Sequence, residues 1–350
     1  MDITQIDKNF KVQTSLSEKD IVFHSVLEEP FSVYGVFFED GRFRRLPESV
    51  AKSVNPGVLG LHANTAGGRV RFVTDSPYIA VYVKLRNVAR SDHFALTGTA
   101  GLDLYARDED GYRYNGTFRF AFDMKDEYDA ILYPKRGECS YQIHMPLYSD
   151  VEELYIGIKE GSSLKTAEGY PNERPVVFLG SSITQGGCAS RPGTSYEAIL
   201  SRKLNFDYIN LGFSGSCFGE DAMMDYIASL PMSLFVYDYD HNAPTPEHLK
   251  ATHEKGFLRI REKHPTLPIL ILTAPIWHPD PWWSGRREIV RATYENAKAR
   301  GDENVYYIDG DELMALCKDE GTVDGCHPTD FGFSSMAEAI ERVMKNIPIK

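Results

Sequence analysis

The sequence has no long apolar run: none of its stretches approaches the roughly 20 residues of a membrane-spanning helix. It also has no excess of positive charge, because 38 lysines and arginines stand against 50 aspartates and glutamates, for a formal net charge of −12. We therefore expect neither nucleic acid nor an anionic membrane as a partner. The first residues, from Met1 onward, lack the basic and apolar regions of a signal peptide, which favours a cytoplasmic protein.

Cysteine is scarce and shows no metal-ligand spacing. The five cysteines are odd in number, and in a chain with no export signal we expect reduced thiols. They are Cys139, Cys188, Cys217, Cys317 and Cys326.

The length of 350 residues exceeds one average domain and suggests two. From about residue 20 to 172, apolar and polar side chains alternate with period two, which predicts that the first domain, residues 1–172, is an antiparallel β-sandwich resembling a jelly roll. We see no strong helical segment in this half. The predicted strands are 33–38, 69–73, 79–85, 102–105, 118–122, 141–145 and 154–158.

Residues 173–350 follow a different pattern, in which buried strand-like runs alternate with helix-like runs. This alternation predicts a three-layer, flavodoxin-like α/β domain with one parallel sheet, and ligands in such sheets bind at the carboxyl ends of the strands. The predicted strands are 176–179, 208–211, 234–237, 269–272 and 305–308. The predicted helices are 196–204, 221–230, 246–263 and 286–300, with a last helix from about Asp330.

Ser182 follows the first of these strands in the run Gly180-Ser-Ser182-Ile-Thr-Gln-Gly186. A serine hydroxyl is a weak nucleophile that needs a neighbouring base, and backbone N–H groups at such a turn can stabilise an oxyanion. Ser181 and Ser182 could instead simply cap a helix.

His327 is the candidate base, and Asp324, three residues earlier, could orient its ring. Asp-x-x-His is a weak motif alone, but here it follows the fifth strand of the domain that carries Ser182. A serine, an aspartate and a histidine in this order favour acyl transfer, a mechanism for which we expect no metal or other cofactor.

Two segments could complete an oxyanion hole with the Ser182 amide. Gly215 follows the second strand and could present a bare N–H group, and Asn242 follows the third strand and could present its side-chain amide. A plain turn glycine and a turn-forming asparagine are the alternatives.

Taken together, these segments resemble the blocks of the SGNH (GDSL-type) hydrolase superfamily. The blocks are Gly180–Gly186, Asn210–Gly215, Asp240-His-Asn242 and Asp324-Gly-Cys-His327, and the resemblance covers about residues 174–346. The β-rich half resembles the amino-terminal sandwich of one branch of these esterases. The resemblance implies a Ser182–His327–Asp324 triad, an oxyanion hole from Ser182, Gly215 and Asn242, and small acyl groups.

Two departures from the family pattern stand out. Ser181 occupies a position where the family often has aspartate, and the third block reads Asp-Tyr-Asp-His-Asn rather than Gly-x-Asn-Asp. Both changes keep the nucleophile and amide positions. The chain also lacks Gly-x-Ser-x-Gly, so it does not resemble the other α/β-hydrolases.

All three tryptophans, Trp277, Trp282 and Trp283, lie in one predicted loop after the fourth strand. Their faces could bind a sugar ring, or they could pack against the sandwich domain. The adjacent Arg286-Arg287 pair could contact a substrate anion, although such a pair usually begins a solvated helix.

These features together predict a serine esterase acting on short-chain, acetyl esters of a carbohydrate or another polar alcohol. An acyltransferase with the same triad is one alternative. A carbohydrate-binding protein with a vestigial hydrolase domain is another. The β domain could cover the sheet edge, wall the pocket or mediate contacts in a homo-oligomer, and the sequence does not decide among these roles.

Overall fold

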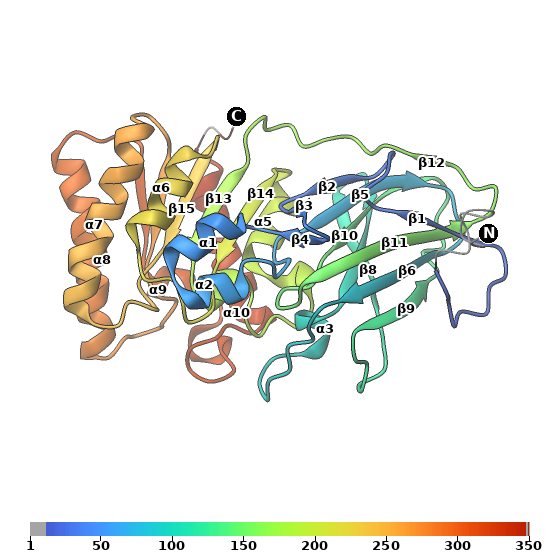
Figure 1. Cartoon of the computed structure of the whole chain (residues 1–350). Helices are drawn as coiled ribbons and strands as arrows, with labels where there is room; N and C mark the ends of the chain where they lie inside the picture. Colours follow the sequence, from blue (N-terminus) through green and yellow to red (C-terminus); the bar gives the residue numbers. More distant parts are fainter. Residues whose placement is uncertain (1–11, 348, 350) are drawn as a thin grey trace. The chain divides into compact units, whose positions relative to one another are not determined.

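The computed structural model describes residues 12–347 and residue 349, and the chain divides into two compact units (Figure 1). The first unit contains residues up to Arg44 and Ala63–Gly169, and the second contains Arg45–His62 and Tyr170–Lys350. The first residues of the chain, in which we found no signal-peptide pattern, lie outside the described residues. Across the described part of the chain, no helix is long and apolar enough to cross a membrane.

The first unit consists of two antiparallel sheets around a shared core. One sheet has the order β1-β11-β6-β9, and the other has the order β12-β5-β10-β7-β8, with β2 also paired to β5. Side chains that alternate toward the inside, such as Val70 and Phe72 of β5 and Val81 and Val83 of β6, form this core. The predicted β-sandwich is confirmed.

The strands of the first unit are short and mostly paired with strands distant in the sequence. A two-residue turn joins β3 to β4, which form a separate hairpin. The strands are β1 (Ile21–Ser25), β2 (Ser32–Tyr34), β3 (Phe37–Glu39), β4 (Arg42–Arg44), β5 (Arg69–Thr74), β6 (Ile79–Leu85), β7 (Leu102–Asp108), β8 (Gly111–Phe118), β9 (Glu127–Leu132), β10 (Cys139–His144), β11 (Val151–Lys159) and β12 (Leu164–Lys165).

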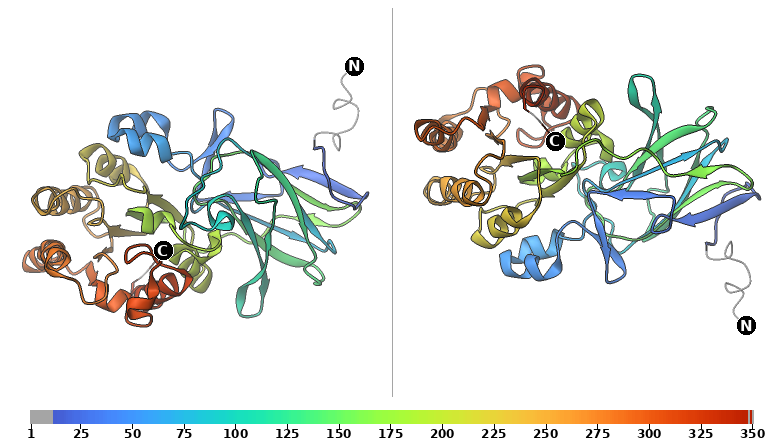
Figure 2. Two further views of the ribbon diagram at one scale, coloured as in Figure 1. Left: turned by 90° about the horizontal axis from the view of Figure 1, so that it is seen from below. Right: turned by 90° about the horizontal axis from the view of Figure 1, so that it is seen from above.

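Three expectations for residues 1–172 are wrong. The predicted strand 33–38 is divided between β2 and β3, which lie in different sheets, because the chain turns at Gly35 with a φ of +74°. The predicted strand 118–122 does not form, because β8 ends at Phe118 and the chain then leaves the ladder with Phe122 exposed. We also expected no strong helical segment here, yet α1 (Glu48–Val54), α2 (Pro56–Leu61) and the short α3 (Leu96–Thr99) are helical. Helices α1 and α2 belong to the second unit, where they lie beside α6 (Asp221–Ser229), as Figure 2 shows with α1 and α2 in blue.

The second unit is built on one parallel sheet of five strands in the order β14-β13-β15-β16-β17, which is the predicted flavodoxin-like topology. Each strand lies within one residue of its predicted range. The strands are β13 (Val176–Gly180), β14 (Tyr208–Gly212), β15 (Leu234–Asp238), β16 (Ile269–Leu272) and β17 (Val305–Ile308).

Helices cover both faces of this sheet. On one face, Tyr196 of α5 (Tyr196–Leu204) contacts both Phe178 of β13 and Phe333 of α10 (Asp330–Met344). On the other face, α6, α7 (Pro246–Lys263) and α8 (Pro281–Ala299) pack in sequence. The remaining helices are the short α4 (Ser182–Gln185), η3 (Pro192–Thr194), α9 (Gly310–Leu313) and η4 (Lys318–Gly321).

Candidate active site

Ser182 lies where β13 ends and α4 begins. The N-cap of α4 is Ser181, whose hydroxyl accepts a hydrogen bond from the Ile183 N–H at 3.1 Å. The Ser182 Oγ atom instead lies 2.9 Å from Nε2 of His327, and the serine is only 5% exposed. The two serines therefore divide the two predicted roles: Ser181 caps the helix and Ser182 faces the imidazole.

The loop that precedes α10 places His327 and Asp324 together. Oδ2 of Asp324 lies 2.7 Å from Nδ1 of His327, while its Oδ1 accepts the N–H groups of His327 at 2.8 Å and Cys326 at 3.0 Å. Gly325 has a φ of +83°, a conformation that glycine adopts without strain, and this bends the loop. The three side chains thus form a continuous hydroxyl–imidazole–carboxylate chain, in which the imidazole can accept the serine proton.

The hydrogen bonds around Asp324 keep it ionised. Burial alone would raise the pKa of Asp324, but the N–H and the ring of His327, together with the Cys326 N–H, outweigh burial and lower the pKa to about 2. A carboxylate with a depressed pKa remains charged at neutral pH and can stabilise an imidazolium beside it.

Replacement of Asp324 by asparagine should reduce folding stability in a pH-dependent way. The folded pKa of about 2 is below the ordinary value of 3.8, so the carboxylate stabilises the folded state at pH values above 3.8. This contribution is lost as the pH falls toward 2. We expect the difference in free energy of unfolding between wild type and Asp324→Asn, measured with urea at several pH values, to shrink over this window. Asp319→Asn, which removes an exposed carboxylate, is the control; a difference that did not change with pH would contradict the argument.

The two further oxyanion candidates follow the strands on either side of β13. Gly215 is an exposed residue of the turn after β14, with a φ of +63°, and Asn242 follows β15. Oδ1 of Asn242 accepts the Cys217 N–H at 3.3 Å, which fixes the oxygen end of the amide and leaves Nδ2 as the donor. The topology therefore brings both segments to the edge of the sheet that carries Ser182.

Cys326 does not have the environment of a nucleophile. Its Sγ lies 3.0 Å from Nε2 of His241, and burial, together with the charges of Asp324 and Asp240, raises its pKa to about 11. Burial and the neighbouring charge of His327 lower the pKa of His241 to about 4, so this imidazole is neutral at neutral pH. All five cysteines are free in this structure.

The tryptophans do not all lie in one loop. The first turn of α8 contains Trp282 and Trp283. The N-cap residue Asp280 accepts a hydrogen bond from the backbone N–H of Trp283 at 3.0 Å. Trp283 packs on the His241 ring with centroids 4.7 Å apart, whereas Trp277 lies 6.0 Å from Nζ of Lys318. Trp283 is thus the tryptophan that the structure connects to the His241–Cys326 pair beside His327. The Asp-Pro signal for a helix start at 280–281 could have predicted this.

The expectation that Arg286 and Arg287 begin a solvated helix is wrong, because both are buried inside α8. Arg286 hydrogen bonds to backbone carbonyls, and Arg287 pairs with Asp311 at 2.8 Å. Sequence reasoning missed these contacts, and also those of the buried Arg45, because a charged residue gives no local signal of burial.

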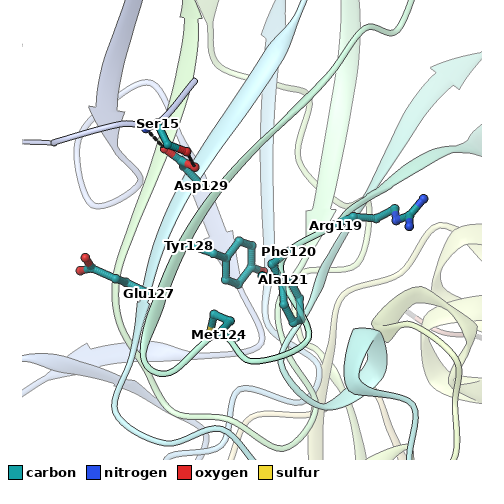
Figure 3. A pocket seen from close by; sticks show the side chains of 8 residues that line it. All are labelled: Ser15, Arg119, Phe120, Ala121, Met124, Glu127, Tyr128 and Asp129. Atoms are coloured by element: carbon teal, nitrogen blue, oxygen red, sulfur yellow. Dashed lines mark hydrogen bonds between the residues drawn. The ribbon is translucent and has the colours of Figure 1, made fainter. Parts of the chain in front are cut away.

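The first unit contains a separate surface pocket with a volume of about 660 Å³ (Figure 3). Phe120 and Tyr128 pack in it with ring centroids 4.4 Å apart, and Asp129 accepts hydrogen bonds from both the N–H and the hydroxyl of Ser15. Arg119 projects from its rim. The pocket contains none of the candidate catalytic residues.

Comparison with known protein families agrees with both halves of this description. Residues 173–345 match the GDSL-like lipase/acylhydrolase family, and residues 21–164 match the amino-terminal domain of SGNH-hydrolase-type esterases. The chain belongs to the GDSL-like (SGNH) lipase/acylhydrolase family and is an esterase or acylhydrolase of the branch that carries an amino-terminal β-sandwich. No curated protein matches the sequence significantly.

Several solved structures share the fold over nearly their whole length. A protein from Bacteroides ovatus assigned to the GDSL-like lipases is 26% identical, with a TM-score of 0.83, and the match covers 93% of this chain and 98% of that one. A salicylyl-acyltransferase from a tetracycline biosynthetic pathway is 21% identical, with a TM-score of 0.75, over 95% and 100% of the two chains. A family two carbohydrate esterase from Cellvibrio japonicus is 12% identical, with a TM-score of 0.62, over 93% and 98%.

Proposed function

We propose that the protein is a serine esterase that hydrolyses short-chain esters, principally acetyl esters, of a carbohydrate or another polar alcohol. The observation that carries this proposal is the chain of hydrogen bonds from Ser182 Oγ through His327 to Asp324, at 2.9 and 2.7 Å. It lies at the carboxyl edge of a parallel sheet, where ligands bind in this class of fold.

In the proposed reaction, Ser182 Oγ attacks the ester carbonyl carbon while Nε2 of His327 takes the hydroxyl proton. The developing negative charge on the carbonyl oxygen is stabilised by the N–H groups of Ser182 and Gly215 and by Nδ2 of Asn242. His327 then protonates the leaving alcohol, and Asp324 stabilises the imidazolium in between. Water, deprotonated by the same imidazole, attacks the acyl-enzyme and releases the acid and Ser182.

The substrate part of the proposal is supported by two features. One is the fold that the chain shares with a family two carbohydrate esterase. The other is Trp283, which packs against His241 beside the catalytic loop, while its neighbour Trp282 is 51% exposed. An aromatic face is a rigid, partly apolar surface of the kind on which a sugar ring can stack. We therefore propose that Trp277, Trp282 and Trp283 bind the substrate. Among them, Trp283 is expected to make the main contact because it packs on the His241 ring.

The test is an acyl series of p-nitrophenyl esters from acetate to octanoate, followed by acetylated xylo-oligosaccharides and acetylated monosaccharides. We expect kcat/KM to fall about tenfold or more between the acetate and the longest chain, since a small acyl site excludes added methylenes. We also expect release of acetate from at least one acetylated sugar. Equal rates on acetate and octanoate would contradict the short-chain specificity.

Acyl transfer is a second candidate because the chain shares its fold with an acyltransferase over most of its length. In this case an acceptor alcohol replaces water in the second step. Candidate alcohols would be added to the acetate reaction, and products would be separated by mass spectrometry. If more transacylated alcohol than free acetate forms at a low alcohol concentration, the result would favour a transferase.

A further inference from the structure

We propose that two buried arginines outside the triad, Arg45 and Arg286, are positioning residues that hold the two oxyanion segments in place. This inference rests on the proposed function, since it concerns the roles of Gly215 and Asn242. Each arginine makes hydrogen bonds to backbone carbonyls on one of these segments, and each is almost completely buried, at 2% and 1% exposed.

Arg45 holds the end of β14, from which the Gly215 turn begins. Its Nη1 donates to the carbonyl oxygen of Gly212 at 2.7 Å and to the carbonyl oxygen of Asn210 at 3.1 Å. Its Nη2 donates to the carbonyl oxygen of Leu61 at 3.0 Å, and its guanidinium lies 4.9 Å from the centre of the Phe213 ring. One planar group thus fixes both backbone and side chain directly before Ser214-Gly215.

The segment that carries Arg45 reinforces the same turn from a second point. Asn55 is the N-cap of α2 and donates from Nδ2 to the carbonyl oxygen of Ser216 at 2.9 Å. Gly57 approaches Ser216 so closely that an added Cβ would lie 2.0 Å from the Ser216 hydroxyl. Residues 45–62, which contain α1 and α2, interrupt the β-sandwich in sequence, but they pack against the turn after β14 and support it.

Arg286 does the same for the segment that carries Asn242. Its Nη2 donates to the carbonyl oxygen of Asp240, and to that of Ala243 at 2.8 Å. These two carbonyls flank His241 and Asn242, so the single guanidinium closes the turn on both sides of the amide donor. The Nδ2 direction of Asn242 then follows from this clamp together with the Cys217 N–H that holds its oxygen.

Arginine suits this role because its rigid, planar guanidinium can donate to several acceptors in a fixed orientation, whereas lysine has a single ammonium on a flexible chain. Arg45 donates from both Nη1 and Nη2, and Arg286 donates twice from Nη2. A donor shifted by about 1 Å loses much of its effect on the transition state but little on ground-state binding. We therefore expect Arg45→Lys and Arg286→Lys to lower kcat about tenfold each, while KM changes less than about threefold.

The decisive experiment is a double-mutant cycle on p-nitrophenyl acetate, with active sites titrated by a fluorophosphonate to correct for unfolded protein. If Arg286 acts through Asn242, Arg286→Lys should lower kcat about tenfold in wild type but less than about twofold in Asn242→Ala. Arg45→Lys acts on the other segment and should lower kcat about tenfold in both backgrounds. If Arg286→Lys does not fold, Arg286→Gln takes its place in the same cycle.

Three results would overturn the inference: an unchanged kcat in folded Arg286→Lys, an unchanged kcat in folded Arg45→Lys, or an equal loss from Arg286→Lys in both backgrounds. These results are distinguishable from failure of the proposed function. If the proposed function is wrong, the wild-type protein would show no esterase activity, or Ser182→Ala would retain the wild-type activity. Neither result depends on the arginine variants.

Discussion

Ser182→Ala should lower kcat for ester hydrolysis by about 10⁴-fold or more while the protein stays folded. The alanine removes the only atom that can form the acyl-enzyme in the proposed reaction, and removal of a nucleophile from a triad leaves only the catalysis due to binding and the oxyanion hole. The Oγ atom is also a hydrogen-bond partner of His327 at 2.9 Å, but its loss leaves no large cavity. Steady-state kinetics on p-nitrophenyl acetate, with circular dichroism of each variant, measures this.

The matched control is Ser181→Ala, which removes the same atom one residue earlier. Ser181 caps α4 through the Ile183 N–H, so its loss should reduce the free energy of unfolding by about 1 kcal/mol and leave kcat within about tenfold. A variant Ser182→Ala that keeps the wild-type rate would rule out Ser182 as the nucleophile. A folded wild type that binds glycans without turnover would instead favour the vestigial-hydrolase alternative.

The second large effect concerns residues 45–62. A chain of residues 173–350 alone should not fold stably, even though it matches the family over most of its length. Leu46, Ala51 and Val58 belong to the same buried core as Phe213 and Met224. Replacing one buried leucine by alanine typically lowers the free energy of unfolding by about 2–5 kcal/mol. Because a domain has only about 5–15 kcal/mol in total, removal of the whole segment should remove much of this stability.

To test this prediction, residues 173–350 would be expressed alone. The circular dichroism, urea unfolding and apolar-dye binding of this fragment would be compared with those of the full chain. In the full chain, Leu46→Ala should reduce the free energy of unfolding by about 2–4 kcal/mol. Lys52→Ala, on the exposed face of α1, should change it by less than about 0.5 kcal/mol. An isolated 173–350 that unfolds in one transition at the same urea concentration as the full chain would contradict this role of the segment.

The strands and helices of the second unit could be predicted well from the sequence because each is a continuous apolar or amphipathic run. β16 and β17 and the helices α5 and α7 begin and end where predicted. The sandwich was predicted less completely: β1, for instance, is partly buried along its whole length, so its alternation is weak. A strand such as 118–122 cannot be excluded from periodicity alone, because a strand also needs a partner.

The geometry of Ser182, His327 and Asp324 follows motifs that are local and occur at strand ends, so these residues could be named in advance. The helices of 45–62 are only seven and six residues long; α1 packs against α6, which is remote in sequence, and α2 packs against α1. The same holds for Arg45 and Arg286. Their burial depends on which carbonyls the folded chain places around them, and sequence patterns contain no such information.

The central claim is that Ser182 carries the acyl group during turnover. The most direct measurement is a rapid acid quench of the enzyme with excess p-nitrophenyl acetate, followed by peptide mass mapping, with a fluorophosphonate adduct mapped in parallel. We predict one acetyl group and one phosphonyl group per chain, both on Ser182, and neither in Ser182→Ala. A stoichiometric adduct on another residue such as Cys326, or a fully active enzyme that shows no adduct on Ser182 with either reagent, would contradict the proposed mechanism.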